Sequence, residues 1–318
     1  MSGYLADMMC CANCGKVEVD DVKLKICTAC RLVKYCSVEC QKNHRPQHKK
    51  ACKKKAAEIR DNRLFTQPDE SYLGECPICC LPLSLDLRQS TRTSCCCTVI
   101  CNGCDCAKKM REVEGGLEKR CAFCRDPLPK KDAGAQWKKK LAEKMKENYM
   151  ERAKANDPAA LSEIGRRCFN EGDYERSFEY CTKAAGLGDA MAHYLLSLLY
   201  ADGKYVEKDL KKREYHLEEA AIGGHDKARC SLGIYEFNNQ RFDRATKHFI
   251  IAAKLGDGDA LERVKKSFQL GLVSKDDYEA ALHGHQAAVD ATKSEQRDAA
   301  YGFDNLSPED QRRWLQRI

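Results

Sequence analysis

Cysteines dominate the first third of this chain and constrain its fold more than any other feature. The 318-residue sequence has 22 cysteines, and all but three of them lie between Cys10 and Cys124. Two thiolates spaced C-x2-C can reach one tetrahedral zinc ion, but they are poorly placed to bridge distant elements as disulfides. The chain has five such pairs: 11/14, 27/30, 76/79, 101/104 and 121/124. The pattern therefore predicts zinc sites rather than a disulfide framework.

The rest of the sequence predicts an intracellular protein with no membrane segment. Its start, MSGYLADMMCCANCG, has no apolar run long enough for a secretory signal. No apolar stretch approaches the roughly 20 residues of a membrane-spanning helix. We therefore expect the chain in the cytoplasm, the nucleus or both, where thiols stay reduced.

The net charge is a weak guide to partners. The formal value is +7, with thiols counted as neutral. Because zinc-bound cysteines are thiolates, fifteen of them with four Zn²⁺ ions would contribute about −7 and cancel that charge. The lysines around Cys52 are more simply explained as the solvated face of a helix than as a phosphate-binding patch. Nucleic-acid binding is therefore disfavoured.

The first cluster lies within residues 10–52 and offers eight ligands. Eight ligands suffice for two closed four-coordinate sites, which are structural because no position is open to water or substrate. So short a segment cannot bury enough apolar surface to fold alone, so we expect zinc to supply most of its folding energy. The ligands, in order, are Cys11, Cys14, Cys27, Cys30, Cys36, Cys40, His48 and Cys52.

This spacing is similar to that of the MYND finger. The resemblance implies proline-rich peptide binding beside the second site, where Gln41 matches the usual glutamine but Arg45 replaces the usual tryptophan. It also implies two interleaved zinc sites, one formed by Cys11, Cys14, Cys36 and Cys40, the other by Cys27, Cys30, His48 and Cys52.

The second cluster, within residues 74–130, resembles a RING finger. Ile78 lies inside its first cysteine pair, and Arg125 and Pro127 follow its last pair, as in the RING pattern. The resemblance implies one site from Cys76, Cys79, Cys101 and Cys104. A second site would combine Cys121 and Cys124 with two members of the run Cys95-Cys96-Cys97. Cys96 aligns with the RING cysteine of this site. Either of its neighbours, Cys95 or Cys97, could replace the missing RING histidine. This finger would therefore bind one or two zinc ions.

In RING ubiquitin ligases, the residue at Ile78 contacts a ubiquitin-conjugating enzyme and the residue at Arg125 steadies the transferring ubiquitin. Such a ligase has no catalytic nucleophile of its own and acts by proximity and orientation. The usual histidine and a contact-surface aromatic are missing here, so a purely structural finger is an equal alternative. No nucleophile elbow, Walker loop or dinucleotide fingerprint points to another enzyme class.

The chain after Asn156 repeats itself with helical periodicity. Ala160, Ala192, Ala228 and Ala260 are spaced by 32, 36 and 32 residues, and an apolar residue follows four positions after each. Alanine pairs such as Ala252-Ala253 recur with a glycine three residues later, which can supply a left-handed helix end. A period in this range, with two helices per unit, is typical of an α-solenoid.

These repeats resemble the Sel-like subclass of tetratricopeptide repeats. Ala192, Leu196 and Tyr200 fit its A-x3-L-G-x2-Y pattern, and Gly165 and Gly233 match its glycine. We therefore expect two small zinc-stabilised α+β fingers followed by an all-α solenoid of helical hairpins. The predicted segments are a MYND-type finger (10–52), a linker helix (53–73), a RING-like finger (74–130), a charged helical linker (131–156), the repeats (157–290) and a C-terminal cap or tail (291–318).

The modules predict a protein-interaction adaptor. The repeats would bind one protein partner, and the fingers would recruit a second. The alternative is a RING-type ubiquitin ligase that selects its substrate through the repeats.

Overall fold

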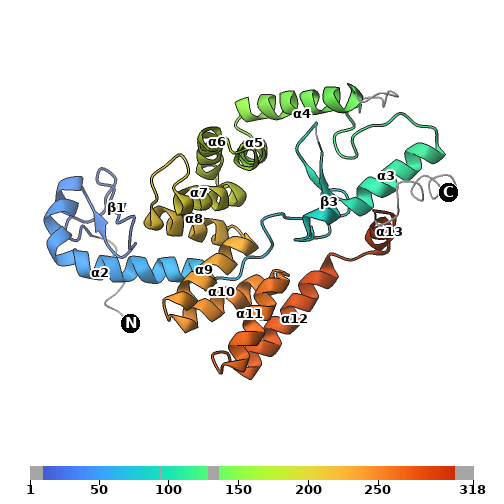
Figure 1. Cartoon of the computed structure of the whole chain (residues 1–318). Helices are drawn as coiled ribbons and strands as arrows, with labels where there is room; N and C mark the ends of the chain where they lie inside the picture. Colours follow the sequence, from blue (N-terminus) through green and yellow to red (C-terminus); the bar gives the residue numbers. More distant parts are fainter. Residues whose placement is uncertain (1–9, 94, 128–135, 305–318) are drawn as a thin grey trace. The chain divides into compact units, whose positions relative to one another are not determined.

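The computed structural model describes residues 10–93, 95–127 and 136–304. Its internal contacts divide the chain into two units, Met1–Thr66 and Gln67–Ile318 (Figure 1). We call the described part of the first the N-terminal unit. In the second, residues 74–127 form the second finger and the helical repeats form the solenoid.

The N-terminal unit is a small sheet followed by a long helix. Strands β1 (Lys25–Ile26) and β2 (Lys34–Tyr35) pair antiparallel. Helix α2 (Val38–Phe65) begins after Ser37, whose hydroxyl accepts a hydrogen bond from the Cys40 amide. The sequence predicted a linker helix over 53–73, but α2 ends at Phe65 and begins well before residue 53. The structure extends it through the finger, so that one helix carries three expected zinc ligands.

The second finger is built around another two-stranded sheet. A 3₁₀ turn, Leu87–Gln89, leads into β3 (Ser90–Arg92), which pairs antiparallel with β4 (Val99–Cys101). Helix α3 (Asn102–Glu114) continues directly from β4. This connection places the pair Cys101/Cys104 at a strand-to-helix junction.

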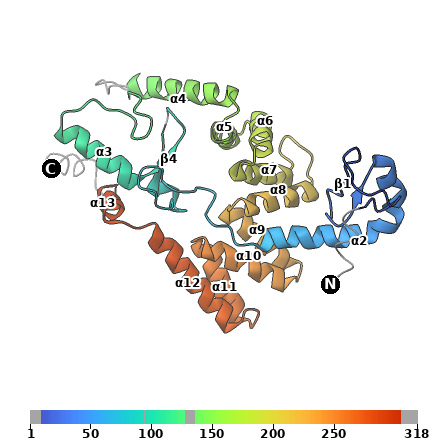
Figure 2. The same cartoon turned by 180° about the vertical axis from the view of Figure 1, so that it is seen from behind.

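The solenoid follows helix α4 (Gln136–Lys154) and consists, within residues 158–291, of four helical hairpins (Figures 1 and 2). Each first helix packs on the second helix of its own hairpin, and successive hairpins pack on one another. The helices are α5 (Pro158–Glu171), α6 (Tyr174–Gly186), α7 (Ala190–Asp202), α8 (Leu210–Ile222), α9 (Asp226–Asn238), α10 (Phe242–Lys254), α11 (Gly258–Gln269) and α12 (Lys275–Ala291).

The repeat landmarks have the structural roles that the sequence predicted. The four landmark alanines, Ala160, Ala192, Ala228 and Ala260, are all completely buried. The glycines after the alanine pairs have positive φ and end the second helices; Gly256, for example, has a φ of +100°. The repeat architecture is therefore present in the fold as well as in the sequence pattern.

A capping residue precedes each landmark alanine by three positions. Asp189 accepts from the Ala192 amide at 2.7 Å, and Asp157 and Asp257 cap α5 and α11 in the same way. In the third repeat, His225 replaces the aspartate and accepts from the Ala228 amide through Nδ1 at 3.3 Å. These side chains satisfy amides that a helix start leaves without intrahelical partners.

The last described helix, α13 (Glu295–Asp304), packs on α3 of the second finger (Figures 1 and 2). The helix start expected at Ser307, and Trp314 after it, lie outside the described residues. Among the helices of the described chain, none combines the length and apolar character that crossing a membrane requires.

Candidate metal centres

Four groups of ligand atoms converge in the described chain. In each group, the candidate atoms all lie within 4.8 Å of one another. We name the groups centre A (Cys11, Cys14, Cys36 and Cys40), centre B (Cys27, Cys30, His48 and Cys52), centre C (Cys76, Cys79, Cys101 and Cys104) and centre D (Cys95, Cys96, Cys121 and Cys124).

Centres A and B share the framework of the N-terminal unit. The loop before β1 and the turn between β2 and α2 bring Cys14 Sγ within 3.5 Å of Cys36 Sγ in centre A. In centre B, Cys27 Sγ lies 3.8 Å from Cys52 Sγ, and Cys30 Sγ lies 3.2 Å from His48 Nε2. The ligand sets alternate along the chain, so neither centre can form without ordering the segments of the other.

Centre C lies at the junction of β4 and α3. Cys79 Sγ is 3.8 Å from Cys101 Sγ, and the Cys101 amide donates to Cys76 Sγ at 3.4 Å. The Cys104 amide donates to Cys101 Sγ at the same distance. Backbone donors of this kind stabilise thiolates, because they point partial positive charge at the sulfur.

Centre D uses the first two cysteines of the triple run. Cys96 Sγ lies 3.9 Å from Cys121 Sγ, and Cys95 Sγ lies 3.3 Å from Cys124 Sγ. The third cysteine, Cys97, has a positive φ of 58° and is buried in the same apolar cluster as Tyr149. The structure therefore places Cys97 in the contact between the finger and the helices, a role that the sequence left open.

These distances fit zinc better than disulfides. Tetrahedral coordination at about 2.3 Å places two zinc-bound sulfurs roughly 3.7–3.8 Å apart, whereas a disulfide requires about 2.05 Å. The sulfur pairs above lie 3.3 to 3.9 Å apart, and all the cysteines described are free thiols. The donor set, thiolates with one imidazole, is the one that zinc prefers in structural sites.

At least one thiol in each centre is more acidic than usual. Burial raises its pKa, but backbone and side-chain hydrogen-bond donors outweigh that effect. In centre D, for example, the hydroxyl of Thr93 lies 3.0 Å from Cys96 Sγ. The resulting pKa values are about 6 in centres A, B and D and about 7 in centre C, for Cys11, Cys27, Cys96 and Cys76 in that order. Each centre therefore offers a thiolate near neutral pH, as metal capture requires.

Aromatic groups that the sequence did not single out surround centre B. The Tyr35 hydroxyl lies 3.1 Å from His44 Nδ1, and the His44 ring stacks on that of His48 with centroids 5.6 Å apart. Tyr35 is itself buried among the ligands. The contacts order the imidazole that faces Cys30, whereas His44 is not among the ligand atoms of the four centres.

The expected partner-contact residues lie outside the ligand sets. Gln41 is exposed on α2, and Arg125 is exposed just after the last cysteine pair, with a positive φ of 64°. Ile78, between two ligands of centre C, is 40% exposed. All three side chains are accessible to a partner.

The solved structures that are similar to this chain include two repeat proteins. A Sel1 repeat protein from Oxalobacter formigenes is 24% identical, with a TM-score of 0.41, over 60% of this chain and 72% of that one. The protective antigen c5321 of uropathogenic Escherichia coli strains, which displays an SLR fold, is 20% identical, with a TM-score of 0.38, over 52% of this chain and 37% of that one.

Comparison with curated protein sequences found no match. The model of the MYND finger family matches residues 11–52, the segment that contains every ligand of centres A and B. Within that segment, the chain is similar to the MYND finger, as its cysteine and histidine spacing predicted.

Proposed function

We propose that this chain is a zinc-stabilised adaptor whose solenoid binds a protein partner through its last two repeats. In this role, zinc holds the fingers in shape and takes part in no reaction. The observation that carries the proposal is an apolar groove with a basic rim on α9–α11. The MYND finger match and the repeat architecture support protein binding in general terms.

The solenoid already binds a connecting segment of its own chain, the turn at Tyr72. The Tyr72 amide donates to the Gly224 carbonyl at 3.2 Å, at the turn between α8 and α9. The Tyr72 ring stacks on His225, which stacks in turn on Tyr194, with centroids 4.3 Å apart in both cases. A backbone hydrogen bond combined with aromatic stacking is a common way of binding peptides, so the repeats are suited to this task.

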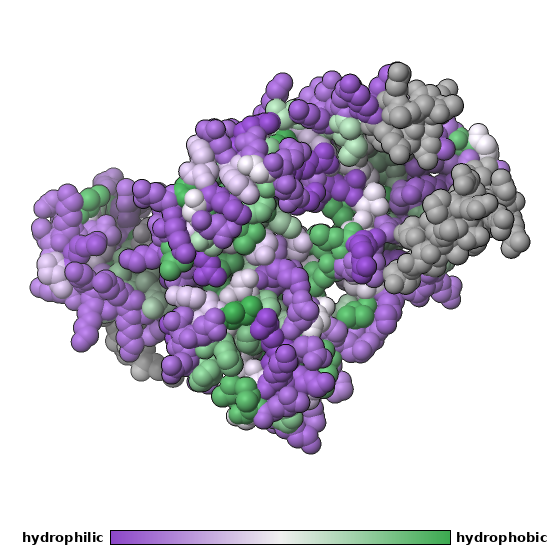
Figure 3. Space-filling model, viewed as in Figure 1, coloured by the Kyte–Doolittle hydropathy of each residue, from purple (hydrophilic) through white to green (hydrophobic). Residues whose placement is uncertain are grey.

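The groove in the last repeats is open. It has a volume of about 220 Å³, with Ile234 and Phe237 on its α9 side, Phe249 at its floor and Leu270 at its α11 end. Leu270 is 66% exposed. In Figure 3, apolar surface gathers around the turn between α11 and α12. Exposed apolar side chains that line a groove are typical of a protein-binding site.

Charge defines the partner more closely. Arg263 and Lys266 line the groove on the same face of α11 as Leu270, at helical spacings of three and seven residues. The Arg263 guanidinium lies 5.7 Å from the centre of the Phe249 ring. Among the described residues, neither cation is in an ion pair. We therefore propose that the occupant is an amphipathic segment with an apolar anchor flanked by aspartate or glutamate.

Peptide binding to the full chain tests this proposal. A fluorescent twelve-residue peptide with leucine anchors and glutamate flanks should bind, and the same peptide with lysine flanks should bind much more weakly. Leu270→Glu and Lys266→Glu should each weaken binding at least about tenfold. Leu210→Glu, at an exposed leucine on α8 outside the groove, is the matched control and should leave the affinity unchanged. Equal binding of both peptides, or indifference to the groove variants, would refute the proposed site.

The fingers would recruit the second partner. The exposed position of Gln41 on α2 supports peptide binding by the N-terminal unit, although Arg45 stands where MYND fingers usually have a tryptophan. A proline-rich peptide titrated against the full chain should lose affinity in Gln41→Ala and not in Gln47→Ala, an exposed glutamine on the same helix. The adaptor would act in a reducing compartment, the cytoplasm or nucleus.

A ubiquitin ligase is the second candidate function. It is favoured by the partly exposed apolar Ile78, held between Cys76 and Cys79 where a conjugating enzyme would bind. Purified chain mixed with a panel of conjugating enzymes should then build ubiquitin chains. Ile78→Ala should abolish this, whereas Leu87→Ala, at an exposed leucine of the same finger, should not. No chain formation with any member of the panel would remove this candidate and leave the adaptor.

A further inference from the structure

One guanidinium from the C-terminal helix reaches the ligand loop of centre C. Arg297 Nη2 donates to Cys79 Sγ at 3.3 Å and to the Leu81 carbonyl at 3.0 Å. Its Nη1 donates to the Pro82 carbonyl at 2.6 Å and to the Thr292 carbonyl at 2.7 Å. The first three of these acceptors lie more than 200 residues earlier in the chain, so the contact joins the two ends of the second unit.

The backbone of α13 approaches the finger so closely that only glycine fits between them. A Cβ atom on Gly103 would lie 2.9 Å from Arg297 Cγ and 3.0 Å from Arg297 Cα. Gln296 donates to the Gly103 carbonyl at 2.9 Å from the same helix. Gly103 lies between the ligands Cys101 and Cys104, so α13 contacts both ligand pairs of centre C.

The loop that Arg297 binds is a tight turn at Cys80. Cys80 has a positive φ of 54°, and the chain turns back so that the Cys76 amide donates to the Leu81 carbonyl at 2.9 Å. A four-thiolate zinc centre carries more negative charge than the ion neutralises, so a cation that donates to a ligand sulfur stabilises it. Arg297 provides this charge and also fixes the carbonyls that shape the loop.

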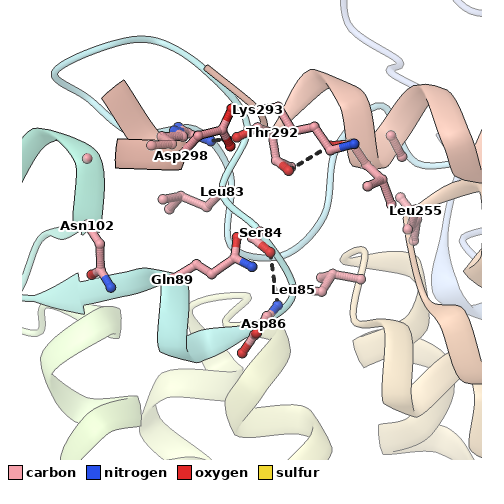
Figure 4. Close-up of a pocket in the computed structure, with 15 residues that line it drawn as sticks. Leu83, Ser84, Leu85, Asp86, Gln89, Asn102, Leu255, Thr292, Lys293 and Asp298 are labelled. Atoms are coloured by element: carbon pink, nitrogen blue, oxygen red, sulfur yellow. Dashed lines mark hydrogen bonds between the residues drawn. The ribbon is translucent and has the colours of Figure 1, made fainter. Parts of the chain in front are cut away.

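The same contacts border an open pocket. A space of about 330 Å³ is lined by the finger loop, the turn between α10 and α11, and the elbow between α12 and α13. Figure 4 shows Leu83 and Gln89 from the finger opposite Thr292 and Lys293 from the elbow, with Leu255 at one side. The docked α13 therefore holds the finger against the end of the solenoid.

We propose that Arg297 is an outer-sphere partner of centre C, so that retention of zinc in this finger depends on docking of the C-terminal helix. The dependence is reciprocal, because a ligand loop that loses zinc also loses the arrangement of acceptors that binds Arg297. Zinc loss at centre C therefore releases α13 from the finger. This goes beyond the adaptor role and requires only that centre C binds zinc.

Site-resolved alkylation of the zinc-loaded full chain tests this inference. The chain is mixed with excess chelator and N-ethylmaleimide, and the rate of modification of each cysteine is followed by peptide mass spectrometry. In Arg297→Met, the four cysteines of centre C should react about 10- to 100-fold faster than in the parent chain, the usual effect of removing an outer-sphere partner. Arg297→Lys, which keeps a cation but loses the planar fork, should fall between the two.

The controls separate this effect from general unfolding. Lys293→Met changes a cation on the same elbow that pairs with Asp290 rather than with a ligand of centre C, and it should leave the rates unchanged. Gly103→Val should accelerate alkylation of the centre C cysteines, although this variant keeps Arg297 in the sequence. The cysteines of centres A and B, together with the buried repeat thiols Cys181 and Cys230, should keep their parent rates in every variant.

Three results would overturn the inference. The first is an alkylation rate of the centre C cysteines in Arg297→Met that is within about twofold of the rate in the parent chain. The second is equal acceleration of the repeat thiols, which would mean that the variant unfolds as a whole. The third is fast alkylation of centre C in the parent chain without chelator, which would show that no zinc is bound there. The third result would not by itself refute the adaptor proposal. That proposal would stand if the groove of the same chain still bound the acidic peptide.

Discussion

At the scale of single residues, close packing between the repeat helices depends on the absence of side chains. A Cβ atom on Gly233 would lie 2.7 Å from Phe249 Cδ1, and one on Gly165 would lie 2.5 Å from Cys181 Sγ. Both glycines were identified from the repeat pattern. Their role is therefore to let α9 approach α10, and α5 approach α6, more closely than alanine would allow.

Gly233→Ala should therefore destabilise the solenoid by about 1–3 kcal/mol, because the new methyl group overpacks a rigid ring. The control is Gly186→Ala, whose Cβ would have no neighbour within 4 Å, and which should be neutral or stabilising by up to about 1 kcal/mol. Urea midpoints from the helical circular dichroism signal compare the two. Equal midpoints for both variants would contradict the packing argument.

A buried carboxyl makes the third repeat sensitive to pH. Burial, with Asp257 nearby, raises the pKa of Asp226 from 3.8 to about 6. The folded state then binds this proton more tightly than the unfolded state. The stability that the protonated group supports is therefore complete below about pH 4 and is lost as the pH rises through 6.

Asp226→Asn should remove that dependence. Relative to the variant, the parent chain should lose roughly 1–1.5 kcal/mol of stability between pH 5 and pH 7.5. The difference between parent and variant, measured by urea unfolding at each pH, cancels any common effect of pH on the zinc centres. A difference that stays constant across the range would show that Asp226 titrates normally.

Among the ligands, the limit of sequence reasoning was the run from Cys95 to Cys97. The spacing of the other cysteines defines their pairs without reference to the rest of the fold. The choice between Cys95 and Cys97 depends on which way each side chain points, and a turn with Cys97 at positive φ sends that thiol toward Tyr149. The packing partner is more than 50 residues away, so no local pattern records it.

At the scale of elements, the helix starts show a repeat signal that the alanine and glycine landmarks did not include. An aspartate stands three residues before Ala160, Ala192 and Ala260, and each caps its helix. The pattern was visible in the sequence, because aspartate is a strong N-cap residue. His225 obscured it in the third repeat, where the imidazole performs the same task.

Asp189→Ala should destabilise the solenoid by about 0.5–2 kcal/mol, because the Ala192 amide loses its partner at a buried helix start. Asp189→Asn retains an acceptor and should recover most of the loss. Asp202→Ala, at the exposed far end of the same helix, should change stability by no more than about 0.5 kcal/mol. Thermal unfolding compares the stabilities of these three variants. An Asp189→Asn variant as unstable as Asp189→Ala would argue against capping by this side chain.

The extent of α2 could not be foreseen from propensity alone. Its residues 38–52 include Pro46 and three expected metal ligands, and a sequence of this kind is typical of an irregular finger rather than a helix. The ligand spacing C-x7-H-x3-C nevertheless places Cys40, His48 and Cys52 on it. Metal geometry thus overrides local preference there.

At the scale of the whole molecule, zinc and apolar burial stabilise different parts of the chain. In the N-terminal unit, the buried cluster consists mainly of ligands, with Leu24 and Tyr35 as the main other members. In the solenoid, the clusters consist of alanine, leucine and other apolar side chains, such as Leu195, Leu196 and Leu199. Loss of metal should therefore affect the two units very differently.

Chelation at neutral pH should unfold the N-terminal unit while the solenoid stays helical. Amide hydrogen exchange should become fast in β1, β2 and the first half of α2 and remain slow in α7 and α10. Exchange should also accelerate in α13, which separates from centre C if Arg297 acts as proposed. Simultaneous loss of protection in α7 would mean that the solenoid also depends on zinc, contrary to its apolar core.

Arg297 shows why the connection between the two ends of the second unit was missed. The sequence pattern identifies modules by local spacing, whereas this contact joins residues more than 200 positions apart. Nothing near Glu295–Asp304 distinguishes one arginine as a partner of a distant sulfur. Such tertiary contacts depend on how the modules dock. The spacing of motif residues along the sequence does not determine that docking.

We infer that four closed zinc centres hold the two fingers in shape. Native mass spectrometry of the full chain tests it most directly, because it gives the metal content and the redox state of the thiols together. We expect four zinc ions per chain, one for each of centres A to D, with every thiol reduced. A compact chain that carries no zinc, and whose cysteines are linked to one another, would contradict it.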